Sequence, residues 1–64
     1  MKILYCIFPD GEYVVPEITL RVLEEKKFPV KWEIFKSRTE RDFFLSQERE
    51  AGRVLTLKEV KEKI

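Results

Sequence analysis

The stretch Ile3-Leu4-Tyr5-Cys6-Ile7-Phe8 decides how this chain can fold. Its six consecutive apolar residues are rich in β-formers, which is typical of a strand covered on both faces. Such a strand lies in the middle of a sheet, so other elements must flank it and cover both of its faces. Pro9-Asp10-Gly11 follows with turn chemistry, because proline fixes φ and glycine adopts positive φ. We expect a central strand that ends in a turn.

The residues after this turn allow two interpretations. Tyr13–Val15 is either a short strand that returns as a hairpin or the lead into a helix, and we favour the direct lead into the helix. In a helical projection of residues 17–27, the charged side chains occupy one arc and Ile18, Val22 and Leu23 lie on the other side. This pattern predicts an amphipathic helix.

The next segment has the period-two pattern of a strand with one wet face. Val30, Trp32 and Ile34 alternate with the charged residues Lys31 and Glu33. Because one face of such a strand meets water, we expect it at or near the edge of the sheet.

Two capping boxes divide the rest of the chain. Ser37 and Glu40 predict the start of a helix over Arg38–Ala51, which Gly52 would end as a left-handed residue. Thr56 and Glu59 form the second box and start a short helix that ends the chain. The apolar segment Arg53–Leu55 between these two helices suits a third strand.

The predicted order is strand, helix, strand, helix, strand, helix, all in a single small α/β domain over residues 1–64. Strands joined by helices favour right-handed crossovers, so we expect a βαβαβα fold in two or three layers. Its three-stranded sheet would be mostly parallel, and Tyr13–Val15 would add a strand only if the hairpin forms.

Composition limits the classes of function. The chain has 64 residues with 13 Lys+Arg against 12 Asp+Glu, a net charge of +1, so no bulk attraction to nucleic acid or to a membrane is indicated. The high Lys and Glu content resembles that of thermophile proteins. Cys6 is the only cysteine and histidine is absent, which excludes a disulfide and the usual zinc staple. The apolar start is too short for a signal peptide or a membrane span, and we expect a cytoplasmic protein.

A domain of this size buries only about 60% of the surface that its unfolded chain exposes, so a partner is the expected reinforcement. Phe43, Phe44 and Ala51 form a thin apolar face in the helical projection, and Leu45 projects to another side. We expect a homo-oligomer or another protein partner, bound through Phe43, Phe44 and Leu45 or through the open edge of the Trp32 strand.

An enzymatic alternative rests on acids in the loops. If the sheet were parallel, Asp10 or Glu12, Glu40 or Asp42, and Glu59 could converge beyond its strand ends as ligands for Mg²⁺ or Mn²⁺ and support phosphodiester cleavage, and we take Asp10, Asp42 and Glu59 as the candidates. Turn and cap chemistry explains Asp10, Glu40 and Glu59 equally well. We therefore assign no catalytic residue, expect no cofactor, and keep Mg²⁺ or Mn²⁺ for the enzymatic alternative alone.

Three stretches together carry a resemblance. They are Met1-Lys2-Ile3-Leu4-Tyr5-Cys6, the segment Leu20–Val30, and Glu48-Arg49-Glu50-Ala51-Gly52-Arg53-Val54-Leu55. In this order they resemble the first part of short PIN-like proteins related to the carboxy-terminal domain of Mut-type nucleases. Of the acids that this family uses, the first falls on Cys6, and Asp42 and Glu59 match the others. The resemblance implies a truncated relative that has lost nuclease activity, or in the alternative a metal-dependent ribonuclease.

Two further resemblances cover shorter segments. Val15–Phe35 is similar to the helix and strand of glutaredoxin-like folds, although the redox cysteines are missing. Ala51–Val60 looks like the end of several small antitoxins, which implies a toxin-binding protein with a helical tail. The leading hypothesis is a non-catalytic, self-associating interaction module.

Overall fold

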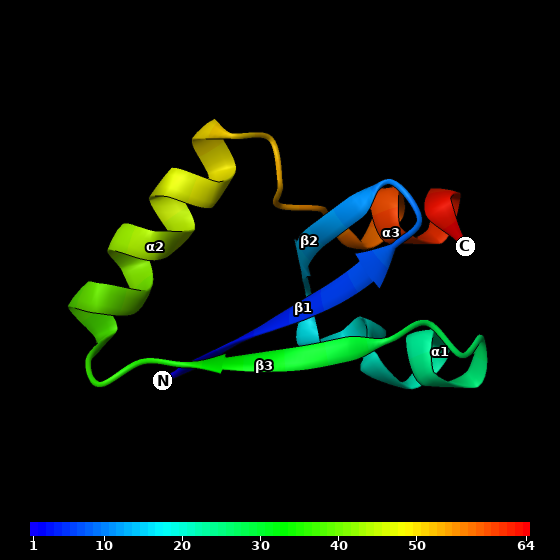
Figure 1. Cartoon of the computed structure of the whole chain (residues 1–64), viewed down its shortest axis with the longest axis horizontal. Helices are drawn as coiled ribbons and strands as arrows, with labels where there is room; N and C mark the ends of the chain where they lie inside the picture. Colours follow the sequence, from blue (N-terminus) through cyan, green and yellow to red (C-terminus); the bar gives the residue numbers. More distant parts are fainter.

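The computed structural model describes all 64 residues and is built around one strand. This strand is β1, Lys2–Phe8, and it lies in the middle of a three-stranded sheet of order β2-β1-β3 (Figure 1). Its neighbours are β2, Gly11–Val15, and β3, Val30–Ile34, and both pair with it antiparallel. The predictions of a central strand over residues 3–8 and of an edge strand over residues 30–34 are confirmed.

The side chains of β1 alternate between two separate hydrophobic clusters, as the pleat of a strand requires. Leu4, Cys6 and Phe8 belong to the larger cluster, and Ile3 and Tyr5 belong to the smaller one. β1 is therefore covered on both faces, as its apolar sequence predicted, except at Ile7, which is 40% exposed. Cys6 is fully buried, and this burial raises the pKa of its thiol.

The lead from the first turn straight into a helix, which we favoured, is wrong. Gly11–Val15 returns along β1 as a hairpin, with Phe8 opposite Gly11 and Leu4 opposite Val15. Only Pro9 and Asp10 connect the two strands, and Gly11 has a φ of 140°, a conformation that glycine adopts without strain. The two-residue turn brings the chain back before a helix can start.

The mostly parallel sheet is also wrong, because the hairpin and β3 occupy both sides of β1 with antiparallel strands. The expected third strand over Arg53–Leu55 makes only one parallel bridge, between Val14 and Val54, on the outer side of β2. In this bridge the Val14 amide donates to the Arg53 carbonyl at 2.7 Å, and the Leu55 amide donates to the Val14 carbonyl at 2.9 Å. No crossover between parallel neighbours of β1 is left.

The first helical segment has two parts. A 3₁₀ turn, η1, spans Glu17–Thr19 and leads into α1, Leu20–Glu25. The tighter winding of η1 buries Thr19, whose hydroxyl donates to the Pro16 carbonyl at 2.6 Å. Ile18 is 76% exposed, so its expected place on the buried arc is wrong, because that projection assumed α-helical winding from the start.

Two longer helical segments start at their predicted caps. α2 spans Arg38–Glu50, and the Ser37 hydroxyl accepts from the Glu40 amide at 3.2 Å. α3 spans Leu57–Lys63 and has a complete capping box between Thr56 and Glu59. α1 and α3 contribute to the larger cluster on one face of the sheet, and α2 contributes to the smaller cluster on the other (Figure 1).

The buried stripe of α2 differs from the predicted one. Phe44 and Leu45 both pack against the smaller cluster, and Glu48 is buried one turn further along the helix. Phe43 is 66% exposed and Ala51 is exposed, so the predicted grouping of Phe43, Phe44 and Ala51 is wrong. Phe44 and Leu45 lie four and three residues before Glu48, and side chains with these two spacings are neighbours on one side of a helix.

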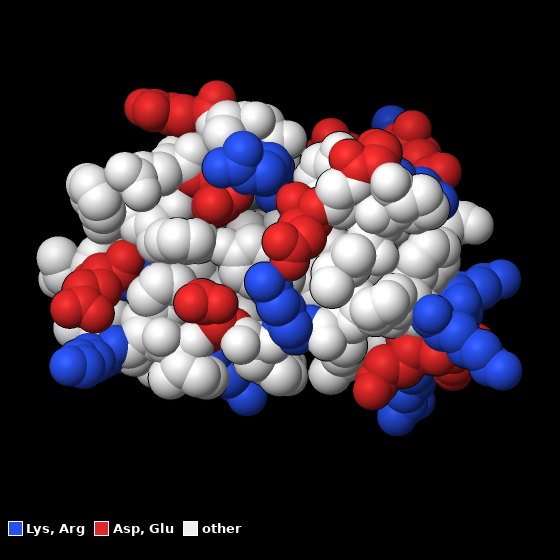
Figure 2. All heavy atoms as spheres, in the orientation of Figure 1, with Lys and Arg blue, Asp and Glu red and all other residues white.

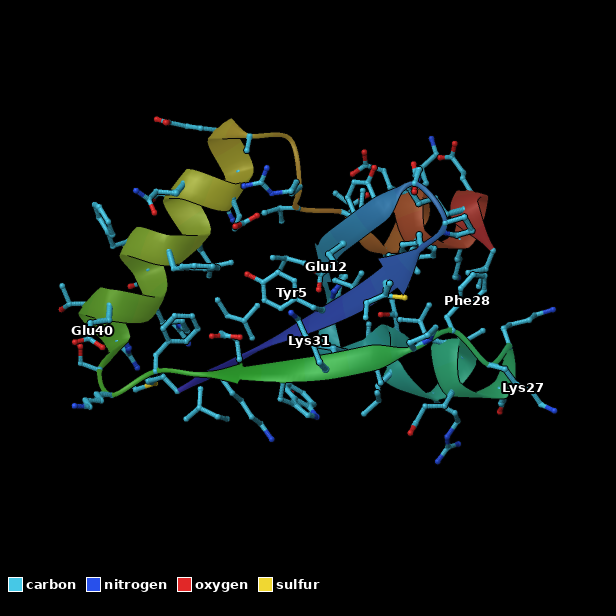
Figure 3. All side chains as sticks on the ribbon, in the orientation of Figure 1. Tyr5, Glu12, Lys27, Phe28, Lys31 and Glu40 are labelled. Atoms are coloured by element: carbon cyan, nitrogen blue, oxygen red, sulfur yellow. The ribbon has the colours of Figure 1, made fainter.

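Both α1 and α2 end in a left-handed residue. At the end of α2, Gly52 has a φ of 73°, which confirms its predicted role. At the end of α1 this position holds Lys27, with a φ of 64° (Figure 3). There the Phe28 amide donates to the Leu23 carbonyl and the Lys27 amide donates to the Glu24 carbonyl, the two bonds of a Schellman motif. In this conformation the Cβ of Lys27 is too close to the carbonyl oxygen that follows it, a strain that glycine would not have.

We predict that Lys27→Gly raises the free energy of unfolding by roughly 1 kcal/mol, because it removes the Cβ from a left-handed residue. Lys26→Gly is the matched control. Lys26 has a φ of −85°, so glycine there should lower stability by about 0.5–1 kcal/mol. Urea unfolding of the two variants measures both effects, and a loss of stability in Lys27→Gly would contradict the described end of α1.

Candidate functional site

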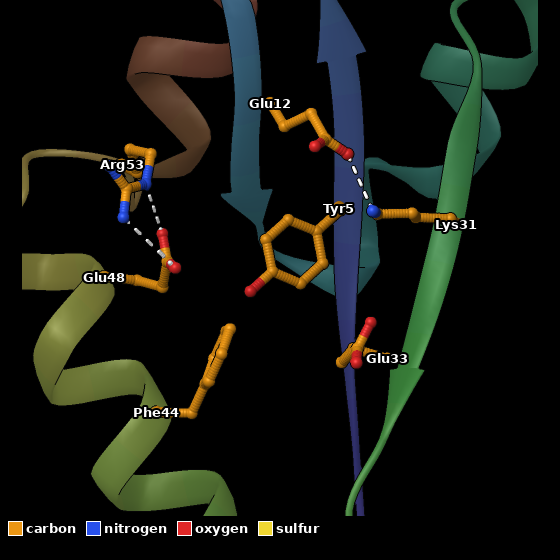
Figure 4. A pocket seen from close by; sticks show the side chains of 7 residues that line it. All are labelled: Tyr5, Glu12, Lys31, Glu33, Phe44, Glu48 and Arg53. Atoms are coloured by element: carbon orange, nitrogen blue, oxygen red, sulfur yellow. Dashed lines mark hydrogen bonds and ion pairs between the residues drawn. The ribbon is translucent and has the colours of Figure 1, made fainter.

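The sheet face beneath α2 contains a hollow of about 310 Å³ (Figure 4). The antiparallel register places side chains from all three strands on this face, and α2 with the segment after it closes the other side. Seven residues line the hollow: Tyr5, Glu12, Lys31, Glu33, Phe44, Glu48 and Arg53. We call it the Tyr5 hollow.

Two ion pairs border the hollow. On the strand side, the Lys31 ammonium lies 2.8 Å from the Glu12 carboxylate, and this hydrogen bond raises the pKa of Lys31. On the helix side, the Arg53 guanidinium donates to Glu48 at 2.6 Å, which raises the pKa of Arg53. The left-handed Gly52 turns the chain so that the Arg53 amide also bonds the Glu48 carbonyl, and this places the two side chains together. Both cations therefore have an intramolecular anion.

Tyr5 forms the floor of the hollow. Its side chain is only 6% exposed, and its hydroxyl is buried without a hydrogen-bond partner in the protein. Burial, followed by the charges of Glu48 and Glu33, raises the pKa of Tyr5 to about 12. The Phe44 ring meets the Tyr5 ring edge to face, with centroids 6.3 Å apart. The floor is thus aromatic, with one unsatisfied polar atom.

Glu33 differs from the other two carboxylates that line the hollow. It takes part in none of the four ion pairs and in no side-chain hydrogen bond of the structure, whereas Glu12 and Glu48 each have a cation. Glu33 is exposed, and it lies on the sheet face of the hollow opposite Ile3, next to the Tyr5–Lys31 pair in the register (Figure 4). The hollow therefore contains one unpaired carboxylate and one unpaired hydroxyl.

The acids proposed as metal ligands have other neighbours. Asp10 accepts from the Tyr13 hydroxyl at 3.0 Å and from the Lys63 ammonium at 2.7 Å, and the bond from Lys63 is the main reason that its pKa is lowered. Asp42 pairs with the adjacent Arg41, and Glu59 accepts from the Thr56 amide in its capping box. The structure contains no group of three or more acid, Cys or His side chains placed to hold a metal ion.

The proposed interaction residues lie in different places. Phe44 and Leu45 are half-buried against the smaller cluster, and Phe43 faces away from the sheet side of α2. Trp32 is half-buried against the larger cluster, with the Lys2 ammonium 4.2 Å from its ring centroid. The four side chains therefore do not form one surface.

The backbone of β3 is open on its outer side. The Ile7 amide donates to the Pro29 carbonyl and the Phe35 amide donates to the Met1 carbonyl. These two bonds show that the odd-numbered residues of this segment are the ones that bond to β1. In an antiparallel pair the hydrogen-bonding direction alternates, so the amides and carbonyls of the even-numbered residues point away from β1. We call these groups, from Val30, Trp32 and Ile34, the β3 edge.

No protein-family model matches this chain, and searches of curated proteins and of solved structures gave no match. None of its helices has the length and the apolar content that crossing a membrane requires.

We predict that Tyr5→Phe leaves the free energy of unfolding unchanged or raises it by up to about 1 kcal/mol, because it removes a buried hydroxyl that has no partner. Tyr13→Phe is the control. It removes an exposed hydrogen bond to Asp10 and should lower stability slightly. A clear loss of stability in Tyr5→Phe, measured by urea unfolding, would show that the hydroxyl is satisfied in the folded protein.

The same variant has a predicted pH dependence. The folded protein keeps the Tyr5 proton up to a pKa of about 12, whereas the unfolded chain releases it near 10.0. The unfolded state therefore binds fewer protons in this range, and stability falls as the pH rises through it. Tyr5→Phe should lose less stability than the natural sequence between these two pH values. Equal losses in unfolding experiments at the two ends of the range would contradict the raised pKa.

Proposed function

We propose that this protein is a non-catalytic interaction module that associates with a second copy of itself through the β3 edge. The observation that carries the proposal is an unpaired strand edge whose sequence is complementary to itself. Val30, Trp32 and Ile34 present free amides and carbonyls, and Lys31 and Glu33 lie between them with opposite charges.

Two copies of β3 can pair antiparallel about a twofold axis at Trp32. This register places Lys31 of each copy opposite Glu33 of the other, and Val30 opposite Ile34. The outward amides and carbonyls of the two copies then bond each other. Trp32 of one copy forms a hydrogen-bonded pair with Trp32 of the other. Lys31 and Glu33 form non-hydrogen-bonded pairs, in which side chains are closest and opposite charges stabilise. The twofold symmetry repeats every favourable contact.

The neighbouring registers are unfavourable. The outward amides and carbonyls of the two strands can bond only in registers that place even-numbered residues opposite even-numbered residues. A slide in one direction places Lys31 opposite Lys31, and a slide in the other direction places Glu33 opposite Glu33. Like charges directly across a strand pair are destabilising, so the charges select the register centred on Trp32.

Pairing would also cover apolar surface. Ile34 is 71% exposed in the single chain, and in this register it lies opposite Val30 of the second copy. Each β3 contributes only five residues, so the interface is smaller than that of permanent dimers. We therefore expect weak association, with dissociation constants of roughly 1 μM to 1 mM.

The surface charge and the chemistry of the core support this class of function. Lys and Arg side chains are interspersed with Asp and Glu over the face in Figure 2, and this face has no broad basic surface of the kind that suits a phosphate backbone. The only thiol, Cys6, is buried with a raised pKa, whereas a reactive cysteine is exposed with a lowered pKa.

We predict that Glu33→Lys and Lys31→Glu each abolish self-association, because each variant places like charges opposite each other in the pair. Mixing the two variants should restore association, since one chain then carries two acids where the other carries two lysines. Sedimentation velocity over a concentration series measures both effects. The single Trp32 provides a second signal, because its fluorescence should change on pairing.

Lys58→Glu is the matched control. It makes the same change of charge as Lys31→Glu at an exposed position of α3, outside the β3 edge, and should leave self-association unchanged. Glu33→Lys breaks no ion pair within the chain, and an unchanged circular dichroism spectrum and urea unfolding curve would separate a loss of association from a folding defect. A natural protein that stays monomeric at all concentrations, or a mixture that stays monomeric, would contradict the proposal.

A further inference from the structure

We propose that residues 53–64 form a strap that closes the outer edge of β2, and that release of the strap lets β2 pair with β2 of a second copy. The strap consists of the segment after α2 and of α3 (Figure 1). It lies at the opposite edge of the sheet from β3, so this inference goes beyond the proposed self-association. Only its last consequence, growth beyond pairs, rests on that proposed function.

The strap occupies the backbone groups of β2 that point away from β1. The Val14 amide donates to the Arg53 carbonyl, and the Leu55 amide donates to the Val14 carbonyl. Because the hydrogen-bonding direction alternates along a strand, the amides of Tyr13 and Val15 point to β1 instead. An unpaired strand edge is a template for pairing with another chain, and proteins cover such edges with loops or helices. The strap is a cover of this kind.

Few buried side chains hold the strap in place. Only two of its residues, Leu55 and Val60, are buried, and both belong to the larger cluster. Segments with few buried apolar contacts open at a lower free energy than the whole domain. Gly52 precedes the strap, and a glycine changes its backbone dihedrals with the least steric hindrance. The strap can therefore open about Gly52 while the sheet stays folded.

Lys63 fastens the far end of the strap to the hairpin of β1 and β2. Its ammonium lies 2.7 Å from the Asp10 carboxylate, and 4.6 Å and 5.4 Å from the ring centroids of Tyr13 and Phe8. The hydrogen bond to Asp10 is the main reason that the pKa of Lys63 is raised, so this contact is formed at neutral pH. It is the only one of the four ion pairs that joins the strap to the hairpin. Loss of the Lys63 charge therefore raises the open fraction of the strap.

The edge that an open strap uncovers suits a second copy of β2. The outward groups come from even-numbered residues, so even-numbered residues must lie opposite each other. With Val14 opposite Val14, Tyr13 of each copy lies opposite Val15 of the other, and pairs of an aromatic and a β-branched residue stabilise a sheet. A register centred on Glu12 places like charges opposite each other and is disfavoured. A chain in which β2 and β3 are both open can pair at both edges, so its assembly continues beyond pairs.

Amide exchange of Lys63→Met tests the opening of the strap. All proteins compared carry Glu33→Lys, which prevents pairing through β3, so the result is independent of the proposed function. We expect the amides of Val14 and Leu55 to exchange roughly threefold or more faster when Lys63 is replaced, because the ion pair and its aromatic contacts are lost.

Ser37→Ala is the control. It removes the cap of α2, which stays folded when the strap opens, so it destabilises the whole domain without loosening the strap. The amides of Tyr13 and Val15 should exchange roughly fivefold faster in this variant, while that of Val14 stays unchanged. Equal responses of Val14 to Ser37→Ala and to Lys63→Met would overturn the strap, because this amide would then be released only by unfolding of the whole domain.

Pairing through β2 is tested in the double variant Val60→Ala, Lys63→Met. It also loses buried methyl groups of the strap, so its open fraction is larger. At high concentration the Val14 amide should exchange at least about twofold more slowly, because it bonds a second copy, while the Leu55 amide stays unprotected. Exchange at Val14 that is independent of concentration would overturn the pairing.

Lys63→Met alone serves for the same comparison if the double variant fails to fold. With Glu33 restored, the double variant should sediment as species larger than two copies. A limit of two copies, together with concentration-dependent protection of Val14, would leave the strap and its β2 pairing in place and contradict only the pairing through β3.

Discussion

The whole structure depends on the burial of β1 on both faces and its pairing on both sides. The side chains of Ile3–Phe8 alternate between the two faces of the sheet, so one layer of helices cannot cover them all. α1 and α3 therefore pack on one face and α2 packs on the other. The two flanking strands take up its backbone hydrogen bonds. With only three strands, both outer strands are edges, and the segment after α2 covers only the edge of β2, through the Val14 bridge. The open edge of β3 follows directly from this arrangement.

The Tyr5 hollow arises from the same constraint. α2 is the only helix that covers the smaller cluster, through Phe44 and Leu45, and Phe35 and Val54 from the segments before and after it add to this cover. These side chains cover only part of the sheet face, so a hollow remains above it, and the Tyr5 hydroxyl is buried beside this hollow without a hydrogen-bond partner. The left-handed end of α2 then brings Arg53 back against Glu48, so that the buried carboxylate is paired and the rim of the hollow is charged.

The sequence predicted features that depend on neighbouring residues and missed those that depend on distant ones. The central strand, the edge strand, both helix caps and the Gly52 terminus follow from local patterns and are confirmed. The direction of the strands was missed, because the choice between hairpin and helix after Gly11 depends on whether the residues after the turn pair with β1. The hollow was missed because it requires the register that brings Tyr5, Lys31 and Glu33 together. A tyrosine within an apolar strand was its only sequence signal, since a buried tyrosine hydroxyl usually finds a partner.

The most direct measurement of the central claim is amide hydrogen exchange of the natural protein at low and high concentration. Within β3, the amides of Lys31 and Glu33 bond to β1 and should be protected at both concentrations, whereas those of Val30, Trp32 and Ile34 point outward. We predict that these three outward amides exchange fast in dilute protein and slow down together as concentration rises, with the strongest protection at Trp32, the centre of the pair. Unchanged exchange at all three, or protection that appears at α2 instead, would contradict self-association through the β3 edge.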